Sequence, residues 1–119
     1  MRAAIYARVS TEEQAREGYS IAAQLHICRQ FCLQQGWDIV DEYVDEGKSA
    51  RASDTTKRLA FRRMLADAEE RKFDLILFHK LDRFSRSIKV TAETVEHLSS
   101  IAIKLVSVTE PIDDSTAQG

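Results

Sequence analysis

The sequence predicts an α/β fold in which helices cover both faces of a mainly parallel sheet. Short apolar runs alternate with segments of helical periodicity in the order β-α-β-α-β-α-β, which implies right-handed crossovers between parallel strands. One run, residues 73–78 (FDLILF), is almost continuously apolar, as expected for a central strand that is buried on both faces. The 119 residues are enough for one domain with its own core.

The first part of the chain is predicted to hold two strands and the helix between them. Residues 3–9 form a short apolar run with β-branched and aromatic members, typical of a buried strand. Ser20 is a natural N-cap for the helix, and Gly36 would end it. Residues 37–44 alternate polar with apolar and predict the second strand. The inward positions of the helix are Ile21, Leu25, Cys28 and Cys32.

The second part is predicted to hold two helices, the central strand at 73–78 and a last strand at 103–108. The polar segments 11–19 and 45–57 have no periodicity and predict loops, and a loop as long as the second is usually functional. The first of these helices is expected to bury Phe61, Leu65 and Ala68, and the second Ile88, Ala92, Val95 and Leu98.

Composition limits the location and the partners of the domain. No apolar run is long enough to span a membrane, and no signal peptide is evident at the start, so a cytoplasmic location is expected. The formal net charge of −2 means that any contact with nucleic acid depends on a local basic cluster or on another domain. Cys28 and Cys32 are better explained as reduced thiols in the core than as metal ligands with His26.

Polar and charged residues follow three of the predicted strands. Because the carboxyl ends of parallel strands meet at one edge of a sheet, we expect these residues to lie together there. They are Arg8 and Ser10 after the first strand, the segment from Asp45 through Ser49 to Arg58 after the second, and Lys80, Asp82, Arg83 and Arg86 after the third.

This set of residues favours phosphoryl transfer. Arginine side chains suit the negative charge that spreads over the oxygens of a phosphate in its transition state, and a serine can be the nucleophile. No Ser-His-Asp arrangement is evident, since the three histidines fall within helices or at a strand end, and the carboxylates are few for a metal phosphatase. Each residue taken singly could be a turn former or part of a surface ion pair.

Three motifs together resemble the catalytic domain of serine recombinases, the resolvase/invertase family: YARVSTEEQ, DEGKSA and KLDRFSRS. The stretches GYSIAAQ and SVTEPIDDSTAQG are most similar to the large serine recombinases, which are phage integrases and transposon recombinases. The resemblance covers essentially the whole chain. It implies a three-layer sandwich around a central sheet of four to five mostly parallel strands.

The resemblance implies site-specific recombination of double-stranded DNA. Ser10 would attack the scissile phosphate and form a 5′-phosphoserine with a free 3′-hydroxyl. Homodimers would assemble into homotetramers for strand exchange. Since the phosphoserine stores the energy of the broken bond, neither ATP nor a metal or other cofactor is expected. The group that deprotonates Ser10 stays open.

The resemblance also assigns roles by position. Arg8, Arg83 and Arg86 would clamp the phosphate, with Arg58 as a fourth arginine, while Asp82 would orient arginines or take part in proton transfer to the 3′-oxygen. Gln14 and Gln24 match residues that position the nucleophile loop. Supporting positions are Tyr6, Asp45, Ser49 and Asp74. Three residues depart from the family pattern: Ala50 and Ala102, where glycine is usual, and Leu59, where proline is common.

Residues 1–119 are expected to be the N-terminal catalytic domain, ending before the family's long dimerisation helix and without its DNA-binding domains. Such a fragment is expected to fold but to be close to inactive. Two alternatives use the same residues: a catalytically silent module for regulation or assembly, and a hydrolase of small phosphate esters.

Overall fold

The computed structural model describes residues 1–9, 20–46, 59–84 and 87–109, and it has the predicted α/β architecture. Four parallel strands form one sheet in the order β2-β1-β3-β4. The strands are β1 (Arg2–Val9), β2 (Asp38–Glu46), β3 (Leu75–Phe78) and β4 (Lys104–Ser107). The helices are α2 (Ile21–Gln35), α3 (Leu59–Glu69), the single turn α4 (Leu81–Phe84) and α5 (Ile88–Ser100).

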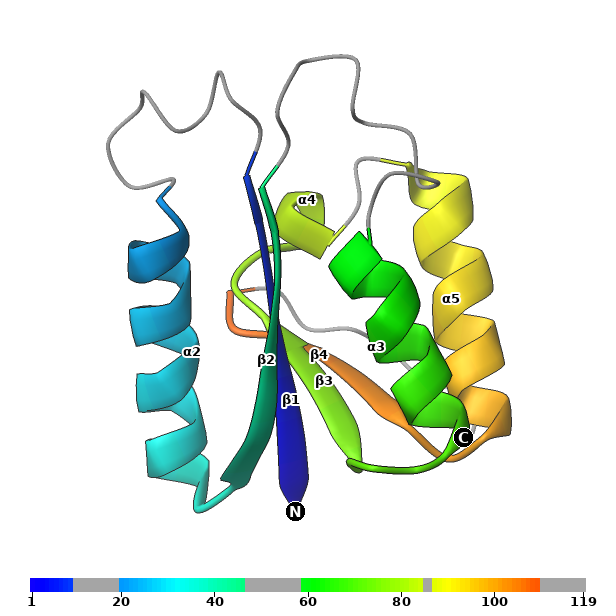
Figure 1. The fold of residues 1–119 in the computed structure, drawn as a ribbon, viewed down its shortest axis with the longest axis horizontal. Coiled ribbons are helices and arrows are strands. Elements are labelled where there is room, and N and C mark those ends of the chain that lie inside the picture. The colour runs from blue at the N-terminus through cyan, green and yellow to red at the C-terminus, as the bar shows by residue number, and fades with distance from the viewer. Residues whose placement is uncertain (10–19, 47–58, 85–86, 110–119) are drawn as a thin grey trace.

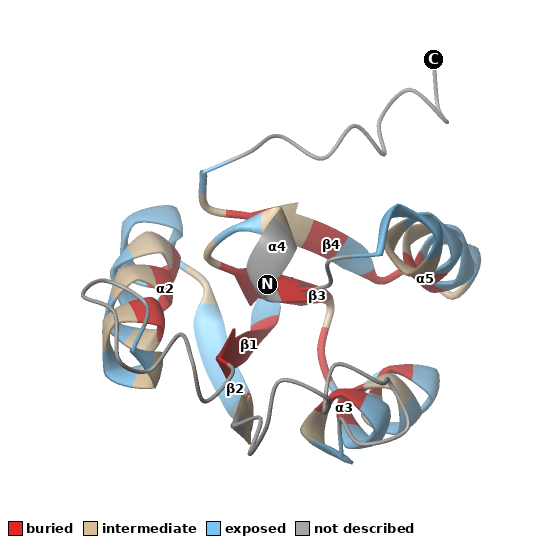
Figure 2. Cartoon of the chain, turned by 90° about the horizontal axis from the view of Figure 1, so that it is seen from above, coloured by how far each residue is buried: buried red, intermediate tan, exposed pale blue. Residues whose placement is uncertain are grey.

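The helices and the sheet form three layers. Helix α2 covers one face of the sheet, and α3 and α5 cover the other (Figure 1). Seen from above, the buried residues of each helix face the sheet (Figure 2). Two apolar clusters result, one between α2 and the sheet and a larger, aromatic one between the sheet and α3, α4 and α5. None of the helices in the described part is long and apolar enough to cross a membrane.

The two interior strands are the most buried elements. All residues of β3 are fully buried, as the sequence predicted for 73–78, although the strand itself begins two residues later, at Leu75. Strand β1 pairs with β2 on one edge and with β3 on the other, and its residues from Ala3 to Val9 are buried. One register shift interrupts this pairing: Val40 of β2 is an extra residue between the partners of Ala3 and Ala4.

Helix α2 begins and ends where the sequence predicts. The Ser20 hydroxyl accepts a hydrogen bond from the Ala23 N–H at 3.1 Å, and Gly36 ends the helix with φ at 75°, a conformation that glycine adopts without strain. Cys28 and Cys32 are buried against the sheet and form no disulfide. Burial raises the pKa of the Cys28 thiol to about 12.

The predicted buried face of α5 is partly wrong. Leu98 is buried, but Ile88 and Ala92 are exposed, and Thr94 takes their place in the interior. At 3.6 residues per turn, Ile88 lies about 80° and Ala92 about 120° around the helix from Leu98, whereas Thr94 lies only about 40° away. The Thr94 hydroxyl donates to the Val90 carbonyl at 2.7 Å, so burial leaves no polar group unpaired.

Two further differences concern the connections. Helix α4 was not predicted; it occupies a segment expected to be part of the turn after the third strand. Ala102, where the family often has glycine, adopts the left-handed conformation with φ at 62°, between α5 and β4. The predicted loop at 11–19 and most of the loop at 45–57 lie outside the described residues.

Replacing Ala102 with glycine should stabilise the domain. An L-residue with a side chain is strained in the left-handed region, and glycine removes that strain, so the free energy of unfolding should rise by about 0.5–1 kcal/mol. Urea denaturation followed by circular dichroism measures the change. The control is Ala66→Gly in the exposed middle of α3, which should lower the free energy of unfolding by about 1 kcal/mol. A loss of stability in Ala102→Gly would contradict the prediction.

Candidate functional site at the carboxyl edge of the sheet

The predicted site residues that the structure describes gather mainly where the parallel strands end. Arg8 of β1 lies beside Asp45 of β2 in the strand register, so the two carboxyl ends are level. Helix α4, which carries Asp82 and Arg83, begins at Leu81, three residues after β3 ends at Phe78. Helix α4 packs against β1. The topology therefore brings segments that are distant in sequence to one edge of the sheet, as the prediction required.

Arg8 is held by the side chain of Gln24. The Arg8 N–H donates to Gln24 Oε1 at 3.2 Å, and Gln24 Nε2 donates to the Arg8 carbonyl at 3.0 Å. Gln24 is fully buried in α2, while the Arg8 residue is 9% exposed. An amide side chain has one acceptor and two donors, so it can pair with both backbone groups of one residue, as a neighbouring strand would. The backbone two residues before Ser10 is thus fixed to the helix layer.

The Asp45 carboxylate joins three elements. It accepts hydrogen bonds from the Tyr6 hydroxyl of β1 at 2.7 Å and from the Ala60 and Phe61 N–H groups of α3 at 2.9 and 3.0 Å. A carboxylate that accepts from the first free N–H groups of a helix acts as its N-cap and also suits the positive end of the helix dipole. Asp45 therefore ties the start of α3, next to Arg58 in the sequence, to the end of β2.

The structure leaves part of the predicted set undescribed. Asp82 and Arg83 are placed only through the backbone of α4. Lys80 precedes α4 and is exposed. The predicted residues outside the described ranges are Ser10, Gln14, Ser49, Arg58 and Arg86.

Asp74 is not brought to this edge. It precedes β3 at the opposite, amino edge of the sheet, where its carboxylate accepts from the Arg2 N–H at 2.8 Å and forms an ion pair with the Arg2 guanidinium. Six residues of extended strand separate Arg2 from Arg8, a distance of about 20 Å. The hydrogen bond from the Arg2 side chain lowers the pKa of Asp74. In this position Asp74 anchors the start of β1, and contact with a phosphate at the other edge is out of its reach.

An ion pair and a hydrogen bond outside the site fix two of the helices on the sheet. Arg29 of α2 makes two hydrogen bonds to Glu42 of β2, at 2.6 and 2.7 Å, and they lower the pKa of Glu42. On the other face, the Tyr43 hydroxyl donates to Asp67 of α3 at 2.5 Å. Burial, followed by this bond, raises the pKa of Tyr43 above its usual range, and the bond lowers the pKa of Asp67. These contacts orient the layers without entering the site.

The described residues give no support to a metal site. No three histidine, cysteine, aspartate or glutamate side chains in this part of the chain are arranged to hold a metal ion. His26 is exposed, whereas Cys28 and Cys32 point into the core. The three residues considered together in the sequence thus lie on different sides of α2.

A model of the family described as the resolvase N-terminal domain matches residues 3–119 of the chain. The chain belongs to the resolvase family. This match and the fold confirm the family and the fold class that the motifs predicted.

Two similar solved structures agree with this assignment. The N-terminal catalytic domain of TP901-1 integrase is 37% identical, with a TM-score of 0.83, over 94% of this chain and 81% of that one. A resolvase family site-specific recombinase from Streptococcus pneumoniae is 32% identical, with a TM-score of 0.79, over 97% of this chain and 76% of that one. The similarity to an integrase domain fits the predicted likeness to the large serine recombinases.

Two relatives are similar in sequence over part of their length. An uncharacterised immunity region protein of Bacillus phage phi105 is 62% identical over 47 residues, which are 40% of this chain and 57% of that protein. A Bacillus subtilis (strain 168) protein named as a candidate DNA recombinase is 38% identical over 85 residues, 71% of this chain. The matched part is only 16% of that recombinase, so this resolvase-family chain corresponds to a small share of it.

Replacing Gln24 with alanine should destabilise the domain strongly. The change leaves the Arg8 N–H and carbonyl without their side-chain partner in a buried place, which should lower the free energy of unfolding by about 2–4 kcal/mol. Urea denaturation of both variants measures this. Gln34→Ala, on the exposed side of the same helix, is the control and should change the free energy of unfolding by less than about 0.5 kcal/mol. Equal effects of the two changes would contradict the role given to Gln24.

Proposed function

We propose that this resolvase-family domain catalyses site-specific DNA recombination with Ser10 as the nucleophile. The Ser10 oxygen attacks a DNA phosphorus, and the 3′-oxygen of the neighbouring nucleotide leaves and takes up a proton. The product is a 5′-phosphoserine. In the second step a 3′-hydroxyl attacks the same phosphorus, a new phosphodiester forms, and the serine is released. The number of phosphoester bonds is unchanged, so the reaction needs no external energy source.

The single observation that carries the proposal is the fixed position of Arg8. Its backbone is hydrogen-bonded to the buried Gln24 side chain, and Arg8 lies one residue before the end of β1 and two before Ser10, next to the segment that carries Asp82 and Arg83. A phosphate in its transition state gains most from cationic donors that are already in place, because no reorganisation is then needed during the reaction. We assign Arg8, Arg83 and Arg86 to the phosphate clamp and Asp82 to orientation of the arginines or to proton transfer.

The Asp45 cap supports a fourth cationic contact. Arg58 comes directly before Leu59, the first residue of α3, and Asp45 ties the first turn of α3 to the end of β2. In our proposal this link holds the region of Arg58 near the phosphate. It would also let Tyr6 act through Asp45, since the Tyr6 hydroxyl donates to the same carboxylate.

The net charge of the chain is consistent with a protein in which one part cleaves DNA and other parts recognise it. With a net charge of −2, the domain has no general attraction for DNA, so the arginines of the site would contact one phosphate locally. We propose that other parts of a longer protein recognise the DNA sequence, and that homodimers pair into a homotetramer to exchange strands. Residues 1–119 would then be its N-terminal catalytic domain.

Replacing Ser10 with alanine should abolish the covalent intermediate. The full-length protein that contains this domain is incubated with a nicked suicide DNA substrate that carries its crossover site, and the products are separated on a denaturing gel. We expect a protein linked to a 5′ end of the DNA with Ser10 present and none with Ser10→Ala, while both proteins bind the DNA equally in a mobility-shift assay. An adduct that persists in Ser10→Ala would assign the nucleophile to another residue.

The same experiment separates the alternatives. Binding without any adduct would favour a silent module for regulation or assembly. An adduct that is lost to water, with no rejoined strand, would favour a hydrolase.

Replacing Arg8 with lysine should slow cleavage while DNA binding stays intact. Lysine keeps the charge but lacks the planar fork of donors that matches phosphate oxygens, so the rate of adduct formation should fall by about 10²–10³-fold. Single-turnover assays with saturating protein measure the rate. The matched control is Arg29→Lys in the ion pair on α2, away from the site, which should leave the rate within about threefold. A normal rate in Arg8→Lys would remove Arg8 from the clamp.

A further inference from the structure

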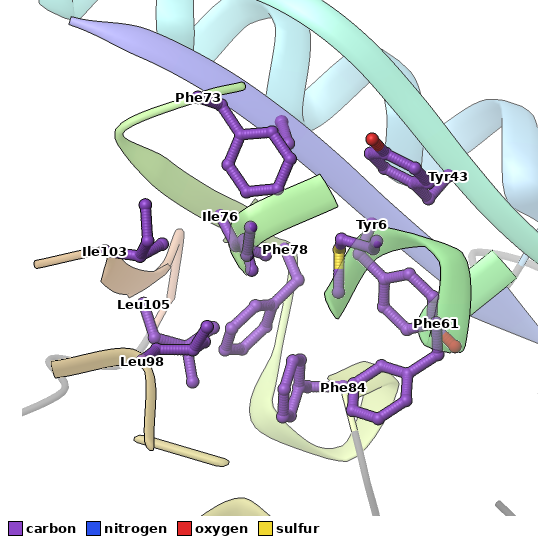
Figure 3. Packing of buried hydrophobic residues seen from close by; sticks show 13 residues of the cluster. Tyr6, Tyr43, Phe61, Phe73, Ile76, Phe78, Phe84, Leu98, Ile103 and Leu105 are labelled. Atoms are coloured by element: carbon purple, nitrogen blue, oxygen red, sulfur yellow. The ribbon is translucent and has the colours of Figure 1, made fainter. Parts of the chain in front are cut away.

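Phe84, a residue that the motifs did not single out, lies in the middle of an aromatic cluster beneath the site. Its side chain is fully buried, and its ring centroid is 4.9 Å from that of Phe78, 5.2 Å from that of Phe61 and 6.1 Å from that of Tyr6. The ring packs edge-on against Phe61 and Tyr6 (Figure 3). Such contacts stabilise a core beyond the apolar area that they bury.

The four rings come from four of the elements that meet at the carboxyl edge: β1, β3, α3 and α4. Tyr6 lies in β1 two residues before Arg8, and Phe78 is the last residue of β3. Phe61 lies in the first turn of α3, and its N–H donates to Asp45. Phe84 is the last residue of α4 and directly follows Arg83. The cluster is therefore the place where the segments with catalytic residues touch one another.

Helix α4 has little stability of its own. It comprises four residues, and an isolated helix of one turn is unstable in water, so packing must hold it in place. Of its two side chains that the structure describes, Leu81 is half-buried and Phe84 fully buried. One backbone hydrogen bond, from the Phe84 N–H to the Lys80 carbonyl at 3.3 Å, closes the turn. Both side chains pack in the aromatic cluster, and Phe84 is the more deeply buried of the two, so its ring is the main contact that holds the α4 backbone.

We propose that Phe84 is a positioning residue of the recombination reaction, which holds the α4 backbone and with it Asp82 and Arg83 against the end of β1. This inference rests on the function proposed above. A displacement of about 1 Å at a phosphate-binding group lowers a reaction rate by about 10²-fold without an equal loss of ground-state binding. Phe84 accordingly affects the rate of cleavage more than the affinity for DNA.

The test compares Phe84→Leu with Phe73→Leu in the full-length protein. Phe73 is the matched control: it is fully buried in the same apolar cluster and packs edge-on against Tyr43, with 6.2 Å between the ring centroids. It lies next to Asp74 at the opposite edge of the sheet. Both changes remove a buried aromatic ring, so they should lower the free energy of unfolding by similar amounts. Only Phe84 belongs to α4.

The readouts are the single-turnover rate of the Ser10–DNA adduct, the affinity for DNA and the folded fraction from circular dichroism. We expect Phe84→Leu to slow adduct formation by at least about tenfold at saturating DNA, with affinity within about threefold of the unchanged protein. Phe73→Leu should leave both values within about threefold. Phe84→Met, whose flexible unbranched side chain adapts to an irregular space better than leucine does, should fall between them and replaces Phe84→Leu if that variant does not fold.

The outcomes distinguish the two proposals. If the unchanged protein forms no Ser10-dependent adduct, the proposed function fails, and the role of Phe84 fails with it. If the unchanged protein forms the adduct and the Phe84 and Phe73 variants react equally fast per folded molecule, the proposed function stands and Phe84 is only a core residue.

Discussion

Strand β1 is paired in parallel along both of its edges, and this double pairing determines where the groups of the site lie. Because parallel strands end at the same edge, pairing with β2 places Asp45 level with Arg8, and pairing with β3 directs the chain into α4 nearby. The strand is buried from Ala3 to Val9, so a shift of its register by one residue would exchange the side chains packed against α2 with those packed on the opposite face of the sheet. The core therefore fixes the position of the end of β1.

Two hydrogen-bonded polar side chains, one buried and one half-buried, order the backbone at this edge. Gln24 pairs with the backbone of Arg8, and Asp45 caps α3 while it accepts from Tyr6. A polar side chain is costly to bury unless it is hydrogen-bonded, and within the described part of the chain no buried side-chain nitrogen or oxygen atom lacks a partner. Polar contacts thus hold the ends of β1 and β2, and aromatic packing holds α4.

Features that depend on neighbours in sequence could be predicted, and features that depend on contacts across the fold could not. The cap at Ser20, the end of α2 at Gly36 and the alternation of strands and helices along the chain follow from local patterns. The cap of α3 comes from Asp45, fourteen positions before the helix begins, so no local sequence motif predicts this cap. Helix α4 is too short for a periodic pattern, and only its packing partners stabilise it.

The site was predictable in part for a similar reason. The carboxyl-edge rule placed Arg8, Asp45 and the segment of Asp82 together, because it needs only the order of the strands. The supporting role of Asp74 rests on the resemblance alone, and the same rule argues against it, because Asp74 precedes its strand and so lies at the other edge. The predicted face of α5 assumed that every apolar residue points inward, yet threonine can be buried when its hydroxyl bonds the preceding turn, as Thr94 does.

The extra residue in β2 has a consequence for the behaviour of the domain at high concentration. Strand β2 is at the margin of the sheet, and its outer edge is a template on which another chain could add a strand. Val40 interrupts the regular pairing of β2 with β1, and the exposed residues Asp38 and Asp41 lie on either side of it in the sequence. A bulge and like charges both oppose edge-to-edge association, so β2 is protected against aggregation by its own irregularity.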